Sequence, residues 1–320
     1  MAHKLTVNNG KAEMFSGQNI VPWHGLGTIV EGLLTSREAI KAASLDWEVE
    51  KRPVTTDYIK DGIKEPQDVE GFHAVCRKDN QLALSVVKSR YELIQNSEAF
   101  DFFDEVVGKG QAFYDTAGSL DDGRIVWIMA KLPGTLFIKN DPSDITEKNV
   151  LLVTSHDGSK ALSAQIVATR VVCANTLSIA LKGAKNQIKI RHTKSYKDKL
   201  EEAQKTLELA NGYFDSLQEL MDKLSNVDMS KDQMKEFTRQ LIPAEESDVP
   251  TRTLNTREAI ETLFVNGRGN KGKTRWDGLN AVTEYVDHSR TTRNGTTRFE
   301  AGLLGSGVAL KQKAFDLLAN

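Results

Sequence analysis

The sequence predicts an α+β fold, in which a mainly antiparallel, curved sheet with packed helices is followed by a helical C-terminal region. Two observations favour it. Between residues 44 and 172, strand-like runs follow one another with connections too short for the crossovers of a parallel sheet. Beyond residue 192, apolar residues recur every three or four positions, as they do in helices. We therefore expect a sheet domain over residues 1–192 and a helical region over residues 193–320.

Turn residues delimit the strands of the predicted sheet. Asp121-Asp122-Gly123 is a strong hairpin signal between two strand-like runs, and the turn 156–159 separates two others. The expected strands are 47–50, 72–77, 81–87, 112–120, 124–132, 150–155 and 162–170.

Three helices are expected within the sheet domain. Thr35 and Glu38 have the spacing of a capping box, which predicts a helix through residue 43. Apolar residues at helical spacing predict a second helix from Asn96 to residue 107. A short third helix, capped by its first residue, is expected over 175–181.

The clearest periodic signal is an apolar stripe in the helical region. Its spacing of three and four residues continues for four heptads and predicts a long amphipathic helix that starts near Thr193 or Ser195. Such a stripe packs either into the core of its own chain or against a second copy, and we favour the core. The stripe consists of Leu200, Ala203, Leu207, Ala210, Phe214, Leu217, Met221 and Leu224.

The rest of the helical region is divided by caps and a polar stretch. Ser230 and Gln233 form a second capping box, for a helix through residue 241. Residues 244–253 are the best linker candidate. Further helices are expected over 256–265, 276–287 and 305–318.

The composition excludes several classes of protein. With 39% hydrophobic and 27% charged residues among 320, the chain is typical of globular proteins rather than disordered ones. Cys76 and Cys173 lie in apolar runs far apart and fit a reducing compartment. Because no apolar run has the length of a signal peptide core or a membrane span, we expect a cytoplasmic protein.

Charge is unevenly distributed along a chain whose formal net charge is only −2. Residues 92–122 contain eight acidic residues, whereas residues 182–199 contain seven basic residues against one acidic. Residues 267–298 contain seven basic against three acidic. This pattern is expected where one face of a protein meets an anionic partner.

Residues 267–274 match the phosphate-binding pattern G-x-x-x-x-G-K-[ST] at every specified position. A nucleotidase needs a buried strand before this loop and a sheet after it, but a helical pattern precedes it and only 46 residues follow. We therefore favour a flexible basic loop, whose glycines and cations can still wrap a phosphate backbone.

No complete catalytic or metal constellation is visible, so we expect neither an enzyme nor a cofactor or metal. The six histidines are scattered, and a metal site could only be assembled in three dimensions. Arg170 precedes Cys173 and Asn175 where a strand is expected to meet a helix, a place suited to an anion or to simple capping. An enzyme would need Arg170, Cys173, His156 and His192 to converge in one cleft.

Several short motifs, in one order from about residue 20 to the C-terminus, resemble the phage/plasmid-like proteins grouped as domain of unknown function 932. They are Pro22-Trp23-His24-Gly25-Leu26-Gly27, Ala117-Gly118-Ser119-Leu120, Ser155-His156-Asp157-Gly158-Ser159, Arg170-Val171-Val172-Cys173-Ala174-Asn175-Thr176, Ile190-Arg191-His192-Thr193 and Tyr285-Val286-Asp287-His288. The resemblance implies an accessory gene of a mobile element, and therefore DNA metabolism or interference with host defence. The predicted architecture is also similar to that of single-strand annealing proteins, although a fold does not fix a function.

Our first hypothesis is an oligomeric DNA-binding protein, with single strands as the preferred partner and strand annealing in recombination as its role. The alternative is an anti-defence or regulatory protein that sequesters a host protein or a nucleotide signal. The residues expected to contact phosphates are Arg170, Lys182, Lys185, Lys189, Arg191, Lys194, Arg268, Lys271, Lys273 and Arg275.

Overall fold

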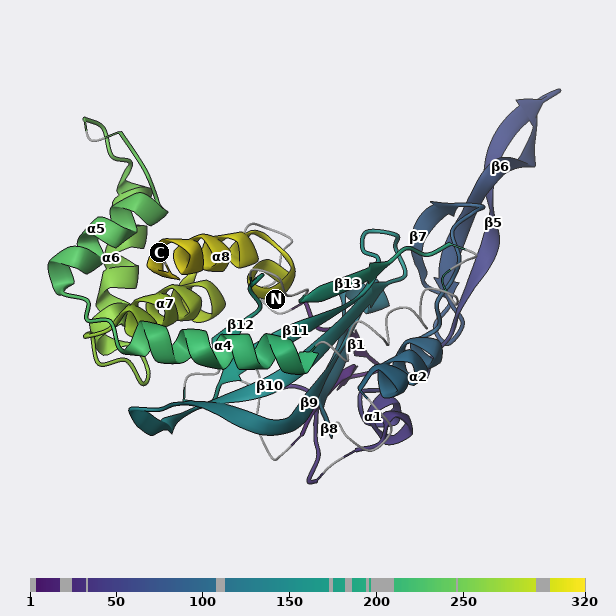
Figure 1. Ribbon diagram of the computed structural model, residues 1–320. Helices are drawn as coiled ribbons and strands as arrows, with labels where there is room; N and C mark the ends of the chain where they lie inside the picture. Colours follow the sequence, from purple (N-terminus) through teal and green to yellow (C-terminus); the bar gives the residue numbers. More distant parts are fainter. Residues whose placement is uncertain are drawn as a thin grey trace.

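The computed structural model describes residues 4–17, 25–32, 34–107, 113–172, 175–181, 186–193, 196, 210–245, 247–291 and 300–319. Within these residues, an eight-stranded sheet forms the centre of the molecule. A three-stranded sheet extends from one end as a long hairpin, and helices gather at the other end (Figure 1). The predicted α+β class, with antiparallel strands and a helical C-terminal region, is confirmed.

The main sheet has the strand order β12-β11-β10-β9-β8-β3-β4, and β13 pairs with β11 on the same edge as β12. Neighbouring strands are antiparallel except β3 and β4, which are parallel. The strands are β3 (Met14–Ser16), β4 (Thr28–Ile29), β8 (Phe113–Leu120), β9 (Ile125–Ile138), β10 (Asp141–Ser155), β11 (Leu162–Arg170), β12 (Asn175–Leu177) and β13 (Gln187–Ile190). A separate short hairpin joins β1 (Val7–Asn8) to β2 (Lys11–Ala12).

The turn between β8 and β9 is the hairpin turn that the sequence predicts. Asp121, Asp122 and Gly123 form a single 3-10 turn in which all three residues have positive φ. A Cβ atom at Gly123 would lie 2.9 Å from the Trp47 ring and 3.0 Å from the guanidinium of Arg77, so only glycine fits there.

Both faces of the central strands are buried. Along β10, Val150 and Leu152 point into a core shared with the helices, whereas Leu151 and Val153 point into a second cluster. The first core includes α1 (Ser36–Ala42), α2 (Asn96–Val107) and α4 (Ala210–Ser225). The second is covered by the N-terminal segment and by the π-helix η3 (Glu300–Leu304). This explains why residues 150–153 are all apolar rather than alternating between apolar and polar.

The three-stranded sheet contains β5 (Val49–Lys60), β6 (Ile63–Arg77) and β7 (Ala83–Lys88). The predicted hairpin of residues 72–77 and 81–87 is confirmed, but β5 and β6 are far longer than the sequence predicts. Because β7 pairs with β6 only from Phe72 to Cys76, residues 54–71 form a two-stranded projection with no buried residue. We call residues 54–71 the distal arm (Figure 1).

The helical region packs against one end of the main sheet (Figure 1). Its elements are α4, α5 (Lys231–Leu241), α6 (Thr251–Asn266), α7 (Arg275–Glu284), the π-helix η2 (Tyr285–Ser289) and α8 (Ser306–Ala319). Both predicted capping boxes are present, at Thr35 with Glu38 and at Ser230 with Gln233. In the described part of the chain, no helix combines the length and the apolarity needed to cross a bilayer.

The described part of the apolar stripe packs inside its own chain. Phe214, Leu217, Met221 and Leu224 on α4 are all buried in the core that includes the sheet. Ala210 begins α4, and Leu200, Ala203 and Leu207 lie outside the described residues. The favoured interpretation, an intramolecular core, therefore holds for these four positions.

The helix predicted over 175–181 is wrong. Residues 175–177 form β12, which pairs with Ala168–Arg170 of β11. The Asp287 carboxylate accepts hydrogen bonds from the amide and the hydroxyl of Thr176, and the buried Lys311 bonds both Asp287 and Thr176. Pairing with an open sheet edge and with this buried ion pair replaces the local capping preference, because tertiary contacts override weak local propensity.

Candidate nucleic-acid interface

Arg170 does not have the role that the sequence suggests. Its side chain is buried, and its Nε and Nη2 atoms donate to the two carboxylate oxygens of Asp144 at 2.7 and 2.6 Å. The remaining donors bond the side chain of Asn270 and the carbonyls of Arg268 and Gly269. Arg170 therefore fastens the 267–274 loop to the sheet and is not available to a phosphate.

The loop that matches the phosphate-binding pattern is occupied by its own chain. The Asp277 carboxylate accepts hydrogen bonds from the amides of Lys271, Lys273 and Thr274, the groups a phosphate would need. Thr274 caps α7, and the element before the loop is helix α6, not a strand. The nucleotidase interpretation is thus excluded by geometry, and the loop is held by hydrogen bonds where the sequence suggested flexibility.

The cations of this loop are also partly neutralised. Lys271 forms an ion pair with Asp141 at 2.5 Å, and Arg275 donates to the carbonyl of Leu318 at 2.6 Å. Arg268 and Lys273 remain exposed, but three carboxylates lie within the same small region. We therefore leave the loop out of the candidate interface.

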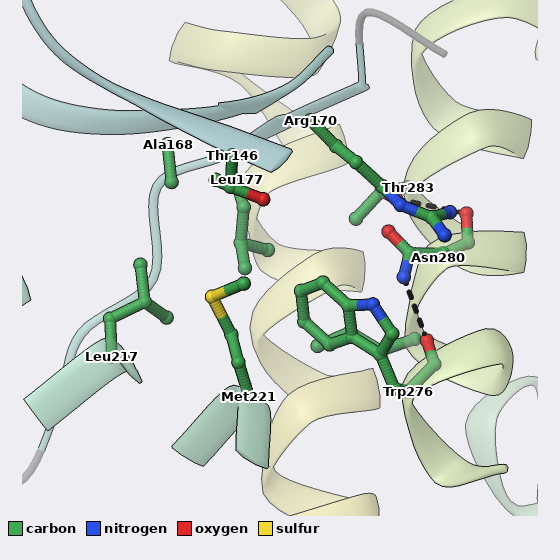
Figure 2. Close-up of a pocket in the computed structure, with 10 residues that line it drawn as sticks. Thr146, Ala168, Arg170, Leu177, Leu217, Met221, Trp276, Asn280 and Thr283 are labelled. Atoms are coloured by element: carbon green, nitrogen blue, oxygen red, sulfur yellow. Dashed lines mark hydrogen bonds between the residues drawn. The ribbon is translucent and has the colours of Figure 1, made fainter. Parts of the chain in front are cut away.

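Beside Arg170 there is a small internal cavity, shown in Figure 2. Side chains from the sheet, α4 and α7 surround it, including Arg170, Met221 and Trp276 (Figure 2). Its volume of about 10 Å³ is room for one water-sized molecule and excludes a larger ligand. This cavity is consequently part of the packing between the sheet and the helices.

Of the residues that the enzymatic interpretation requires, Arg170 lies apart from His156 and His192. His156 comes directly after Ser155, the last residue of β10. Arg170 pairs with Thr146, near the first residue of the same strand. His156 and His192 lie near each other, and Cys173 is outside the described residues. Within the described part of the chain, no group of three His, Cys, Asp or Glu side chains is arranged to hold a metal ion.

His156 has a structural role. Its ring is buried, its Nε2 atom is 2.9 Å from Oδ1 of Asn96, and its edge packs against Trp47. Burial, with the nearby charges of His192 and Arg77, lowers the pKa of His156 to about 3. The folded protein therefore keeps this ring neutral where an unfolded chain would protonate it.

This pKa shift predicts a loss of stability in mild acid. Because the folded pKa lies below the ordinary value of 6.5, stability from His156 is complete above pH 6.5 and declines toward pH 3. Between pH 7 and pH 5 the free energy of unfolding should fall by ~2 kcal/mol through this group. Denaturant titrations at several pH values measure the free energy of unfolding of the protein and of His156→Gln. The variant should lack this part of the decline. An equal decline with pH in both proteins would contradict the lowered pKa of His156.

A cavity larger than the one beside Arg170 lies where the three-stranded sheet meets the main sheet. Its volume is about 730 Å³, and three segments line it: 86–91 after β7, 157–161 between β10 and β11, and 191–193 after β13. Four cations surround it, namely Lys88, Arg90, Lys160 and Arg191. We call this cavity the cation groove.

Local chemistry fixes the three walls of the cation groove. The hydroxyl of Ser155 accepts from the amide of Lys160 and donates to its carbonyl, both at 3.0 Å, which closes the 156–160 turn. Tyr91 donates to the carbonyl of Ser155 at 2.7 Å and stacks on the ring of His192, with ring centroids 4.8 Å apart. The motifs 155–159 and 190–193, far apart in the sequence, therefore meet at one surface.

The cation groove carries an excess of positive charge. Four cations face one lining carboxylate, Asp157. Lys88, Arg90 and Arg191 are exposed, and among the described residues none of the four cations has an ion-pair partner within 4.0 Å. By contrast, Lys131 is paired with Glu147. These unpaired cations can meet an anionic ligand without first breaking an internal pair.

Sequence reasoning found only part of this site. Arg191 lines the groove, and Lys189 is exposed two residues before it on β13. Lys182, Lys185 and Lys194 lie outside the described residues. Lys88, Arg90 and Lys160 were missed because they lie outside the long basic stretches of the sequence, and only the fold brings them together with Arg191.

A family model with the description Domain of unknown function (DUF932) matches residues 83–303, which is more than half of the chain. The chain belongs to this family. The DUF932 segment begins at the first residue of β7 and ends in η3, so it contains every residue that lines the cation groove. The distal arm lies outside it. No curated protein and no solved structure gives a significant match to the chain.

Proposed function

We propose that this DUF932 protein binds DNA, preferably single-stranded, in the cation groove. The observation that carries the proposal is the meeting of four cations from three separate segments around one open cavity, none of them ion-paired with another described residue. A role in recombination on a phage or plasmid, including strand annealing, is part of the same proposal.

The chemistry of the groove suits a flexible polyanion. Its cations come from different strands, so they can follow successive phosphates rather than bind one compact anion. Ser159 and Thr193 add hydroxyl groups that can donate to phosphate oxygens. A single strand can bend into a concave surface, whereas a stiff duplex presents a convex one.

Removing two of the four cations tests the proposal. Arg90→Ala/Arg191→Ala should weaken binding of a fluorescent single-stranded oligonucleotide at least about 10-fold at low salt and flatten the salt dependence by about 1.4 in log–log slope, because two phosphate contacts are lost. Fluorescence anisotropy over a series of salt concentrations measures both quantities.

The matched control is Arg239→Ala/Arg252→Ala, which removes the same charge from exposed positions on α5 and α6 at the opposite end of the molecule (Figure 1). It should bind like the unmodified protein. Equal weakening by both double variants would mean that overall charge, and not the groove, governs binding. Absence of binding by the unmodified protein at low salt would reject the proposal.

The size of the groove favours one alternative, the capture of a nucleotide signal. A volume of about 730 Å³ is within the range of small-ligand sites. Competition separates the two functions: mononucleotides or dinucleotides that displace the oligonucleotide at micromolar concentration support capture of a signal. A longer strand that binds progressively more tightly with length supports DNA binding.

A further inference from the structure

The distal arm is an exposed element that is joined to the rest of the described chain at its base, where the amide of Ser89 donates to the carbonyl of Gly71. Within residues 54–71, β5 and β6 pair only with each other, and every side chain is exposed or half-buried. Isolated two-stranded hairpins are marginally stable in water, so a projection of this length indicates a binding partner.

The tip of the distal arm is apolar and its flanks are acidic. Ile59 is 78% exposed and Ile63 is 65% exposed, on either side of the Asp61-Gly62 turn. The distal arm contains five carboxylates against two lysines, which leaves an excess of three negative charges. The carboxylates are Asp57, Asp61, Glu65, Asp68 and Glu70, and the lysines are Lys60 and Lys64.

The cation groove has the complementary surface. Its four cations exceed its one carboxylate by three positive charges, which equals the negative excess of the distal arm. Val86, which lines the groove, is 59% exposed and offers an apolar contact to an isoleucine. Among the described residues, Asp57 is the one arm carboxylate with a cation within ion-pair distance, Lys64, so the other four can meet a partner.

We propose that the distal arm of one copy of this chain binds in the cation groove of a second copy. In Figure 1, β5 and β6 extend beyond β7 and away from the main sheet. The contact therefore joins two molecules, and reciprocal exchange of arms gives a closed dimer. The acidic flanks of the arm meet the groove cations, and its apolar tip covers Val86.

Arm binding also regulates access to the groove, a consequence that rests on the proposed DNA binding. An arm and an oligonucleotide cannot occupy the same cations together. Self-association therefore lowers the apparent affinity for DNA in proportion to the fraction of occupied grooves.

Light scattering on three proteins tests the contact. The full chain should change from monomer to dimer as its concentration rises, with the transition moving to higher concentration as salt is added. A short-arm variant, with residues 56–67 replaced by Asn-Gly, joins the paired positions Thr55 and Asp68 and should remain monomeric. Arg90→Glu/Arg191→Glu, which reverses charge in the groove, should also remain monomeric.

Mixing the two monomeric variants gives the decisive result. The short-arm variant keeps its groove, and the charge-reversed variant keeps its arm, so an equimolar mixture should form a 1:1 complex although neither associates alone. Circular dichroism confirms that each is folded, and Asp61→Lys/Asp68→Lys replaces the short-arm variant if that one is not. A monomeric full chain at high concentration, or a short-arm variant that dimerises like the full chain, would overturn the proposal.

DNA binding distinguishes the two proposals. The short-arm variant should bind the oligonucleotide more tightly than the full chain. The ratio of the two affinities should equal one divided by the fraction of full-chain molecules whose groove is not occupied by an arm. Dimerisation through the arm without any DNA binding would support this contact and reject the proposed function. DNA binding with equal affinity in both proteins, together with the absence of a dimer, would support the proposed function and reject the arm contact.

Discussion

Arg77→Met is expected to lower the free energy of unfolding by about 3–5 kcal/mol, because it leaves the buried carboxylate of Glu13 without its cation. Arg77 is fully buried, and its Nη2 atom donates to Glu13 at 2.6 Å and to Asp79 at 2.7 Å. Its guanidinium also lies 4.0 Å from the centre of the Trp47 ring and donates to the carbonyl of Asp122. Arg77 thus joins β6 to the N-terminal segment and to the β8–β9 turn.

Urea denaturation measures the loss, and the same sheet provides the control. Arg52 on β5 pairs with Glu50 at 2.5 Å, but both side chains are more than one-third exposed. Arg52→Met should therefore cost less than about 1 kcal/mol. Arg77→Met/Glu13→Gln should recover part of the loss, since the second change removes the uncompensated charge. A loss for Arg77→Met no larger than that for Arg52→Met would contradict the buried cluster.

Arg170→Ala is expected to cost a similar amount, about 3–5 kcal/mol, without weakening oligonucleotide binding by the folded protein. Asp144 is buried, and among the described residues its remaining hydrogen-bond donor would be the indole N–H of Trp276, at 3.1 Å. It also releases Asn270 and the carbonyls of the 267–274 loop. The helical region would lose one of its polar connections to the sheet.

Two measurements separate this structural role from the phosphate contact that the sequence suggests. Thermal or urea denaturation should show the loss, and Arg170→Lys should show a smaller one, because lysine keeps the charge but not the two-point contact with Asp144. Anisotropy below the unfolding transition should give an unchanged affinity. A stable Arg170→Ala protein with weakened DNA binding would restore Arg170 to the interface.

Local signals in the sequence were sufficient for many elements of the fold. Capping boxes at Thr35 and Ser230 begin helices where predicted, because a cap uses only groups within one turn. The hairpin turn at Asp121-Asp122-Gly123 is likewise decided by residues that tolerate positive φ. The class of the fold follows from these elements and their short connections.

The long hairpins could not be predicted in the same way. The distal arm is exposed on both faces, so its strands lack the alternation of apolar and polar residues that marks a strand. Pro53 and Pro66 also argue against strands, because proline cannot donate a backbone hydrogen bond to a neighbouring strand. Both are nevertheless in strands of the three-stranded sheet, at positions with a paired strand on one side only. Residues 175–177 form β12 because they pair with an open edge of β11, although Asn175 favours the cap of a helix.

The sequence by itself determined where the turns and helix caps lie, that the fold is α+β, and that cations are abundant in its second half. Only the tertiary structure decided which cations remain available. Arg170 is neutralised by Asp144, 26 residues before it, and held by Asn270, 100 residues after it. Arg90, Lys160 and Arg191 meet with no such partner among the residues that the structure describes. The energy of a charge depends on its burial and on the charges within a few ångströms, and both are set by contacts between distant parts of the chain.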